Sequence, residues 1–216
     1  NITKLCTKHN KILFFTSTSE IYGKNNQIPF SENSNRVLGS TNIERWCYSS
    51  SKALVEHYIN ALHKHNNLKF VIFRLFNIYG PGIEGRVVDK FAINAINNKN
   101  LLVYGNGKQT RCFLYIDDCL DAFYKILKNK KLLNKTYNIG NNKKTNMKKL
   151  AQITKKLAKS KSNIKFVDTK VIHKDGFEDI DIRIPNIDLL NKSISWKPKI
   201  NIEKGMLKLI NSLKKR

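Results

Sequence analysis

The sequence has only four cysteines, and none of them stands in a pattern that binds metal or carries redox chemistry. There is no C-x-x-C pair, and the five histidines are not at metal-ligand spacing from a cysteine. Cys47 and Cys112 fall inside predicted elements, so we expect both to be small buried thiols. The pattern predicts no metal site and favours a reducing, cytoplasmic compartment over one in which disulfides form.

Long apolar runs are missing as well. No stretch is long and apolar enough to cross a bilayer, and the sequence shows no signal peptide, internal repeat or low-complexity tail. We therefore expect no membrane partner.

Acidic residues are scarce: 16 Asp and Glu stand against 40 Lys and Arg, which gives a formal net charge of +24. The lysines are scattered as pairs such as 143–144 and 155–156, without a basic tail or an arginine-rich block. Because Asn, Ile and Lys are abundant together, a general compositional bias explains the charge better than a nucleic-acid partner, and a basic RNA-binding protein is the alternative. A positive field would also draw in a negatively charged nucleotide.

Hydrophobic residues make up 41% of the 216, enough for a sizeable core, and they recur in short β-rich runs between helical stretches. The predicted strands are 11–15, 69–76, 101–104, 111–116, 136–139 and 164–167. The predicted helices are 44–64, 87–98, 117–128, 146–159 and 202–214. This alternation predicts an α/β protein with a parallel sheet.

A tyrosine and a lysine stand one helical turn apart, at Tyr48 and Lys52. A lysine ammonium favours the phenolate of a neighbouring tyrosine, which can then act as a general base or acid on an alcohol. Thr18 and Ser19 supply hydroxyls just past a short apolar strand, where open α/β sheets bind their ligands. Alone, the pair is a weak signal, because an aromatic residue on a helix face and a solvated lysine would give the same letters.

Several further motifs accompany that pair in a fixed order along nearly the whole chain. They are TSTSEIYG (16–23), YSSSK (48–52), RLFNIYGPG (74–82), GRVVDKF (85–91), VYGNGKQTRCF (103–113) and IDD (116–118). Together they resemble the extended short-chain dehydrogenase/reductases, the NAD-dependent nucleotide-sugar epimerase, dehydratase and decarboxylase family. The resemblance implies NAD as cofactor, a nucleotide-diphosphate sugar as substrate, and a homodimer. It also implies a Rossmann-like doubly wound parallel sheet with a smaller α/β substrate-binding region.

The Gly-rich fingerprint that opens the cofactor site in this family is absent. Gly23 is the first glycine, and no G-x-x-G-x-x-G occurs. We therefore expect the chain to be the C-terminal part of a longer protein, truncated within the NAD-binding domain; an inactive fragment is the alternative. On this interpretation, residues 1–140 complete the NAD-binding domain, with substrate-binding insertions around 77–110, and residues 141–216 mainly bind substrate.

By resemblance, Tyr48 is the base that takes the proton of a sugar hydroxyl, and Thr18 hydrogen-bonds the reacting oxygen. Lys52 supports the tyrosine and contacts the nicotinamide ribose. Ser17 and Tyr79 are the other residues that we expect beside the cofactor.

The pair after Thr18 bears on the reaction that follows oxidation of the sugar. The 4,6-dehydratases of this family place Asp-Glu there, whereas this chain has Ser19 and Glu20. Ser-Glu resembles the UDP-glucuronate decarboxylases, and FEDIDIRIPNI (177–187) resembles their R-x-P-x-I segment, which makes Arg183 the residue that pairs with the substrate carboxylate. The resemblance thus favours decarboxylation of UDP-glucuronate, with a 4,6-dehydratase or a 4-epimerase as alternative enzymes.

The substrate-binding residues are also carried over by resemblance. Arg111 is expected to grip the diphosphate, and Asn77 to bind the phosphates or the sugar. Tyr104 and Val88 would line the pocket of the base. Arg86 is a further candidate, although a solvated loop residue would read in the same way.

Overall fold

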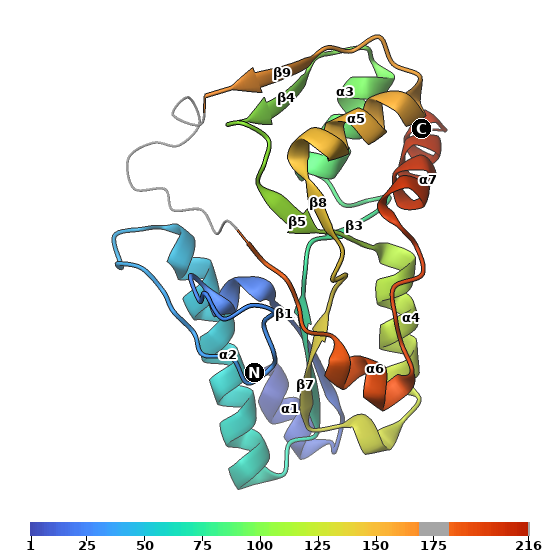
Figure 1. Cartoon of the computed structure of the whole chain (residues 1–216). Helices are drawn as coiled ribbons and strands as arrows, with labels where there is room; N and C mark the ends of the chain where they lie inside the picture. Colours follow the sequence, from blue (N-terminus) through green and yellow to red (C-terminus); the bar gives the residue numbers. More distant parts are fainter. Residues whose placement is uncertain (169–181, 216) are drawn as a thin grey trace.

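The computed structural model describes residues 1–168 and 182–215, which form two lobes joined by several short strands (Figure 1). The lower lobe in Figure 1 contains a parallel sheet of β1 (Leu13–Thr18), β2 (Phe70–Leu75) and β7 (Lys135–Ile139), in the order β1-β2-β7. In its register, Phe15 lies beside Ile72, and Phe73 lies beside Tyr137. The α/β fold class with a parallel sheet is therefore confirmed.

The first four residues of the central strand β2 are all buried. Successive side chains of a strand point to opposite sides, so both faces of β2 are covered. On one face, Phe70 and Ile72 pack with Ile59 of α2 (Arg45–Asn66), near α1 (Ile2–Lys8). On the other face, Phe73 joins a cluster with residues of α4 (Ile116–Leu127) and α6 (Asp188–Ile194) and with Trp196. Helices thus cover both faces of the sheet, and its carboxyl edge remains open to a ligand.

The upper lobe packs three helices around a second core. These are α3 (Val87–Ile96), α5 (Met147–Ala158) and α7 (Ile202–Lys214), beside the parallel pair β4 (Leu101–Tyr104) and β9 (Ile164–Val167). Buried Phe91, Leu150 and Met206 bring one side chain from each helix into this core.

Most of the elements that the sequence did not predict are short strands between the lobes. β3 (Ile78–Tyr79) and β6 (Leu114–Tyr115) pair in parallel, where the sequence predicted a turn at 77–82. β5 (Thr110–Cys112) pairs antiparallel with β8 (Lys144–Asn146), which was not predicted. Two 3₁₀ helices, η1 (Ser19–Tyr22) and η2 (Lys130–Leu132), complete the described elements.

The prediction that Cys47 is a buried thiol is wrong, because this residue is exposed; Cys112 is buried as expected. The buried face of α2 carries Trp46, Ser49 and Ala53, at helical spacing, and Cys47 lies off that face. Of the segment that resembles the R-x-P-x-I motif, residues 177–181 lie outside the described part. Within the described ranges, no helix is both long and apolar enough to span a bilayer.

Candidate active site

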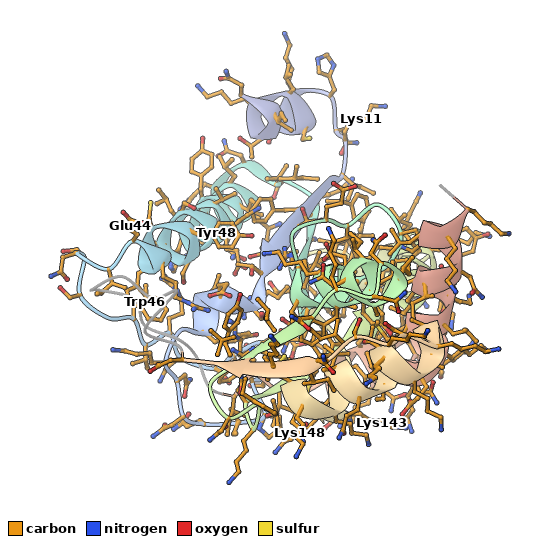
Figure 2. The ribbon with its side chains drawn as sticks, turned by 90° about the horizontal axis from the view of Figure 1, so that it is seen from above. Lys11, Glu44, Trp46, Tyr48, Lys143 and Lys148 are labelled. Carbon is orange, nitrogen blue, oxygen red and sulfur yellow. The ribbon has the colours of Figure 1, made fainter. Side chains whose placement is uncertain are left out.

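A groove of about 680 Å³ opens at the carboxyl end of β1 and gathers residues that are far apart in the sequence. Of the predicted catalytic residues, it is lined by Thr18, Ser19, Glu20, Tyr48, Lys52 and Arg183. Figure 2 shows Tyr48 and Trp46 on α2, on the opposite side of the molecule from Lys143 and Lys148. The fold therefore places the whole predicted set in one cavity, at the edge where the sequence predicted it.

The end of β1 fixes the backbone of Glu20. Thr18 is the N-cap of η1, and its Oγ1 accepts a hydrogen bond from the Glu20 backbone N–H at 3.2 Å. Ser49, fully buried on α2, donates its hydroxyl to the Glu20 carbonyl oxygen at 2.8 Å. With both backbone groups held, the Glu20 side chain has a defined direction into the groove.

Two arginines meet at the Glu20 carboxylate. Arg45 donates through Nε to Oε2 at 3.2 Å and through Nη2 to Oε2 at 3.0 Å, and Arg183 donates through Nη1 to Oε1. Burial lowers the pKa of the Arg183 guanidinium below its ordinary value; Glu20 opposes this shift, and the charges of Arg111 and Arg45 add to it. The described residues that line the groove include four basic side chains, Arg45, Lys52, Arg86 and Arg183, and two carboxylates, Glu20 and Glu44.

Arg183 also keeps an unused donor. Its side chain is buried, with 8% of the residue exposed, and its Nε has no hydrogen-bond partner within the described residues. A buried N–H without a partner is costly, so this atom is suited to an acceptor that a ligand brings.

Tyr48 stands at the rim of the groove, with 52% of its surface exposed. Lys52 Nζ donates to the Thr16 carbonyl oxygen at 2.9 Å and lies 4.8 Å from the centre of the Phe15 ring, so strand β1 sets its position. Beside them, the Ser17 hydroxyl is buried and has no partner in the described part of the chain. A buried hydroxyl without a described partner, in an open groove that an ammonium also lines, fits a polar cofactor such as a dinucleotide.

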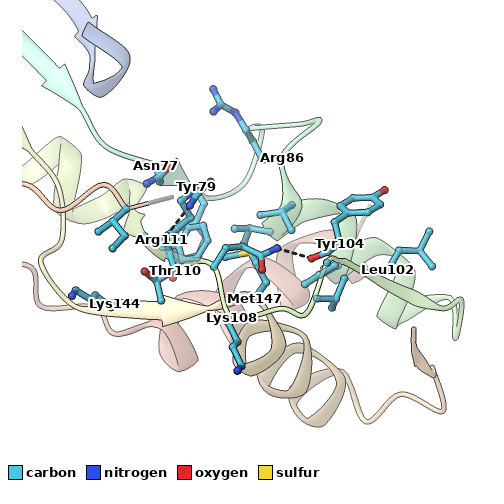
Figure 3. Close-up of a pocket in the computed structure, with 18 of the residues that line it drawn as sticks. Asn77, Tyr79, Arg86, Leu102, Tyr104, Lys108, Thr110, Arg111, Lys144 and Met147 are labelled. Carbon is cyan, nitrogen blue, oxygen red and sulfur yellow. Dashed lines mark hydrogen bonds between the residues drawn. The ribbon is translucent and has the colours of Figure 1, made fainter. Parts of the chain in front are cut away.

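A second cavity, of about 1000 Å³, lies next to the first and is drawn in Figure 3. Asn77 and Arg86 line both cavities. Basic side chains line the second cavity, and its described lining residues include no Asp or Glu; the basic ones are Arg86, Lys108, Arg111 and Lys144. Its other lining residues include Val88, Leu102, Tyr104 and Met147. Basic groups beside apolar and aromatic groups suit the phosphates and the base of a nucleotide.

Local bonds hold this second cavity in shape. Asn77 has a φ of 41°, in the left-handed region, and its Nδ2 donates to the Cys112 carbonyl oxygen at 3.2 Å. Gln109 Nε2 donates to the Tyr104 carbonyl oxygen at 2.7 Å, the dashed line beside Tyr104 in Figure 3. The predicted substrate residues Asn77, Tyr104 and Arg111 are thus brought together by β4, β5 and the end of β2.

Tyr79 takes a different place from the other predicted cofactor residues. It lines the second cavity and not the groove with Tyr48, and its ring packs edge-on against Phe113 and Tyr115. Its hydroxyl lies against Gly205, where an added Cβ would stand 1.9 Å from it. Burial raises the pKa of Tyr79, which is consistent with a core residue and not with a titrating one.

Two groups of site residues were missed from the sequence. Arg45 stands three residues before Tyr48 on the same helix, so helical spacing alone could have indicated it. Lys108 and Lys144 sit in the cavity because of the antiparallel pairing of β5 with β8, which no motif indicated. The described residues contain no cluster of His, Cys, Asp and Glu that could hold a metal ion.

Comparison with known proteins gives three kinds of match. Residues 1–140 match the model of the NAD dependent epimerase/dehydratase family. The chain is 38% identical to the bifunctional polymyxin resistance protein ArnA of Wigglesworthia glossinidia brevipalpis, over 97% of this chain and 36% of that protein. It is 35% identical to a UDP-N-acetyl-alpha-D-glucosaminuronate decarboxylase of Bacillus cytotoxicus, over 97% of this chain and 66% of that protein.

Among solved structures, the chain is similar to dTDP-glucose 4,6-dehydratase from Bacillus anthracis, solved in complex with NAD. The TM-score is 0.84 at 25% identity, over 100% of this chain and 66% of that one. The chain thus spans less than two thirds of the length of each of these relatives.

Proposed function

Because the chain belongs to the NAD dependent epimerase/dehydratase family, we propose that the complete protein modifies a nucleotide sugar with NAD as cofactor, and that its reaction is the decarboxylation of UDP-glucuronate. The observation that carries the reaction type is the buried Arg183, which shares Glu20 with Arg45 and keeps Nε without a partner in the described chain. The buried Nε–H of Arg183 lacks an acceptor among the described residues, and the carboxylate of a sugar acid would supply a charged one. A neutral hexose would not.

The relative from Bacillus cytotoxicus supports the same reaction class, since it is named as a decarboxylase of a UDP-hexuronate. Its substrate carries an N-acetyl group that UDP-glucuronate lacks. The proposal therefore includes UDP-N-acetylglucosaminuronate as a second substrate to be tested.

In the proposed mechanism, bound NAD supplies the hydride acceptor for C4 of the sugar. Tyr48 Oη removes the proton of the 4-hydroxyl, and Thr18 Oγ1 orients the same oxygen. The ketone at C4 makes the substrate a β-keto acid, so the bond from C5 to the carboxyl carbon can break and its electron pair passes to the ketone oxygen. Arg183 would bind the carboxylate before carbon dioxide leaves, and Glu20 would relay to C5 a proton that comes from solvent.

The residues beside the groove that would hold NAD are Ser17, Tyr48 and Lys52. The buried Ser17 hydroxyl, which has no partner among the described residues, supports this assignment, as does the Lys52 ammonium that lines the same groove. The second cavity, with Asn77, Arg86 and Arg111, would hold the nucleoside diphosphate.

A 4,6-dehydratase or a 4-epimerase is the second candidate. The likeness to a 4,6-dehydratase structure favours it, and Ser19 in place of an aspartic acid weighs against a dehydratase. Elimination of water would need an acid at that place, and a serine hydroxyl is a poor one.

We also propose that the complete protein is a homodimer. Leu54, Val55 and Tyr58 on the outward face of α2 are 69%, 37% and 46% exposed, and a partner could bury them. Light scattering of the complete protein would test this, and a monomer at micromolar concentration would contradict it.

The decisive experiment incubates the product of the complete reading frame with NAD and either UDP-hexuronate, and follows carbon dioxide and reduced cofactor together. Carbon dioxide without net reduced cofactor is expected if the ketone is reduced again, and carbon dioxide with accumulating reduced cofactor if the keto sugar is released. No carbon dioxide from a protein shown to bind NAD would overturn the decarboxylase and favour the second candidate.

A further inference from the structure

The two arginines hold Glu20 in unequal ways. Arg45 contacts both carboxylate oxygens, with Nη2 at 3.2 Å from Oε1 and 3.0 Å from Oε2, and Nε at 3.2 Å from Oε2. Arg183 contacts Oε1 through Nη1 alone. An arginine that spans both oxygens is held more strongly and in a more defined orientation than one that reaches a single oxygen. Glu20 therefore has a main partner in Arg45 and a second contact that it can give up.

Arg183, in turn, is not satisfied by Glu20. Its Nε is buried without a partner in the described chain, and its side chain faces the groove beside Thr18 and Tyr48. A ligand carboxylate in the groove would give this guanidinium two contacts in place of one.

We infer that Arg45 is a positioning residue, which retains Glu20 so that Arg183 can exchange it for the carboxylate of the substrate. Without Arg45, Glu20 would turn both oxygens to Arg183, and the closed ion pair would compete with the substrate. This inference rests on the proposed function, because it takes the ligand to be a sugar acid.

The position of Arg45 fits this role. It is the first residue of α2, its side chain is 15% exposed, and its guanidinium lies 5.9 Å from the centre of the Trp46 ring. One turn further on, Ser49 holds the Glu20 carbonyl oxygen. One helix therefore positions both the backbone and the carboxylate of Glu20, together with Tyr48.

The test is the preference of the complete protein for the acid sugar, measured by calorimetry as the Kd of UDP divided by the Kd of UDP-glucuronate. R45Q is expected to lower this ratio by roughly tenfold to a hundredfold, the effect of losing a charge-assisted contact, with the Kd of UDP unchanged. The double variant E20Q/R45Q removes the competing carboxylate, so its ratio of the two Kd values is expected to return to within a few fold of the wild-type ratio. Its turnover is expected to be lost, because Glu20 takes part in the proposed reaction. A merely structural role of Arg45 would not give this recovery.

Arg36→Gln is the matched control. Arg36 is exposed, and its Nε donates to the carbonyl oxygen of Ile21 in η1, the 3₁₀ helix that also contains Glu20. Because Arg36 does not contact the Glu20 carboxylate in the described structure, its loss should leave the ratio unchanged. If R45Q loses UDP binding through misfolding, R45K takes its place: the charge remains without the fork, and the ratio is expected to fall several-fold.

An unchanged ratio in R45Q, or a ratio that stays low in E20Q/R45Q, would overturn the inference. Failure of the proposed function is a separate result: a wild-type protein that prefers the acid sugar but releases no carbon dioxide would overturn the decarboxylase and leave the role of Arg45 standing.

Discussion

A buried arginine dominates the candidate site at the scale of single residues. Arg183 and Glu20 are separated by 163 positions in the chain, yet they form an ion pair in a place from which water is largely excluded. Such a pair stabilises a fold only when its remaining donors are satisfied, and Nε of Arg183 is not, within the described residues. The incomplete satisfaction points to binding and not to stability as the reason for this arginine.

Arg183→Gln should abolish most of the decarboxylation that we propose for the complete protein. We expect kcat/KM for UDP-glucuronate to fall by roughly a hundredfold or more, because one partner of a buried charge pair is removed. The Kd of UDP should not change, because Arg183 does not line the second cavity. Steady-state release of carbon dioxide and calorimetry with UDP measure the two quantities, with Arg36→Gln as the control. A dehydratase or an epimerase would tolerate the change far better, so full activity on a neutral nucleotide sugar would contradict the assignment.

The predictability of the site differs from residue to residue. Thr18, Glu20 and Tyr48 belong to motifs whose order along the chain was informative, and the fold brings them together. Arg45 was missed because the motif that contains Tyr48 begins after it. Tyr79 was expected beside the cofactor, and packing against Gly205 places it in the other lobe's core instead. Motifs indicate chemistry, whereas the partner of each charge depends on the tertiary structure.

At the scale of elements, an ion pair between Glu56 of α2 and Arg74 of β2 connects a helix to the central strand. Arg74 Nη2 lies 2.7 Å from Glu56 Oε2, and Arg74 Nη1 donates to the Tyr22 hydroxyl oxygen at 2.9 Å. Burial raises the pKa of Tyr22 to about 12, so its hydroxyl stays protonated and donates to Asn138 Oδ1 at 2.7 Å. Through this network, α2 and η1 keep a fixed position relative to the sheet.

Glu56→Ala should therefore destabilise the fold by about 3–5 kcal/mol, because it leaves the buried Arg74 charge without its main partner. The free energy of unfolding in urea measures this. Asp121→Ala is the control, since Asp121 pairs with Lys125 at 3.2 Å on a half-exposed helix face, where such pairs contribute little. Equal losses in the two variants would contradict the structural role of the Glu56–Arg74 pair.

The buried thiol of Cys119 on α4 should make the free energy of unfolding depend on pH. Burial raises its pKa from 9.0 to about 12, and the thiol of Cys112 shifts in the same direction. The unfolded thiol ionises first as the pH rises, so the stabilisation from Cys119 is fully present below about pH 9 and is lost on the way to about pH 12. Urea unfolding across this window should show a steeper fall in stability for the wild type than for Cys119→Ala. Cys47→Ala, which removes an exposed thiol, should follow the wild-type slope; a Cys119→Ala slope equal to that of the wild type would contradict the assignment.

Elements with a clear apolar pattern were predictable from sequence, and strands of two or three residues were not. β4, β9 and α7 have the predicted bounds, because each is a clear apolar pattern between turn residues. β8 has three residues and exists only through its pairing with β5, and β3 has two residues paired with β6. Such strands follow from long-range contacts, which local periodicity does not contain.

At the scale of the whole molecule, the candidate site lies where the two lobes adjoin. The groove with Tyr48 belongs to the edge of the lower sheet, the basic cavity belongs to β4 and β5, and Asn77 and Arg86 line both. The order of motifs predicted a cofactor region and a substrate region, which stay predictions, and it did not indicate the pairing of β3 with β6 or of β5 with β8. A nucleotide sugar that spans both cavities would reach from the basic groups around Arg111 to Tyr48.

The formal charge of +24 raises the question of whether nucleotide binding depends on the whole surface or on a few lysines. At physiological ionic strength the screening length is about 8 Å, so charges outside the cavity are largely screened, whereas those that line it act at close range. The double variant K108E/K144E should therefore weaken UDP binding by roughly tenfold or more, by reversing two charges at the cavity wall. The control K156E/K161E makes the same change in net charge at exposed positions of the same lobe that do not line the cavity, and it should leave the Kd of UDP within about twofold. Calorimetry in buffer of physiological salt measures both. Equal weakening of UDP binding in the two variants would show that the electrostatic field of the whole protein governs this binding. Tight, salt-sensitive RNA binding that only K156E/K161E abolishes would instead support the nucleic-acid alternative.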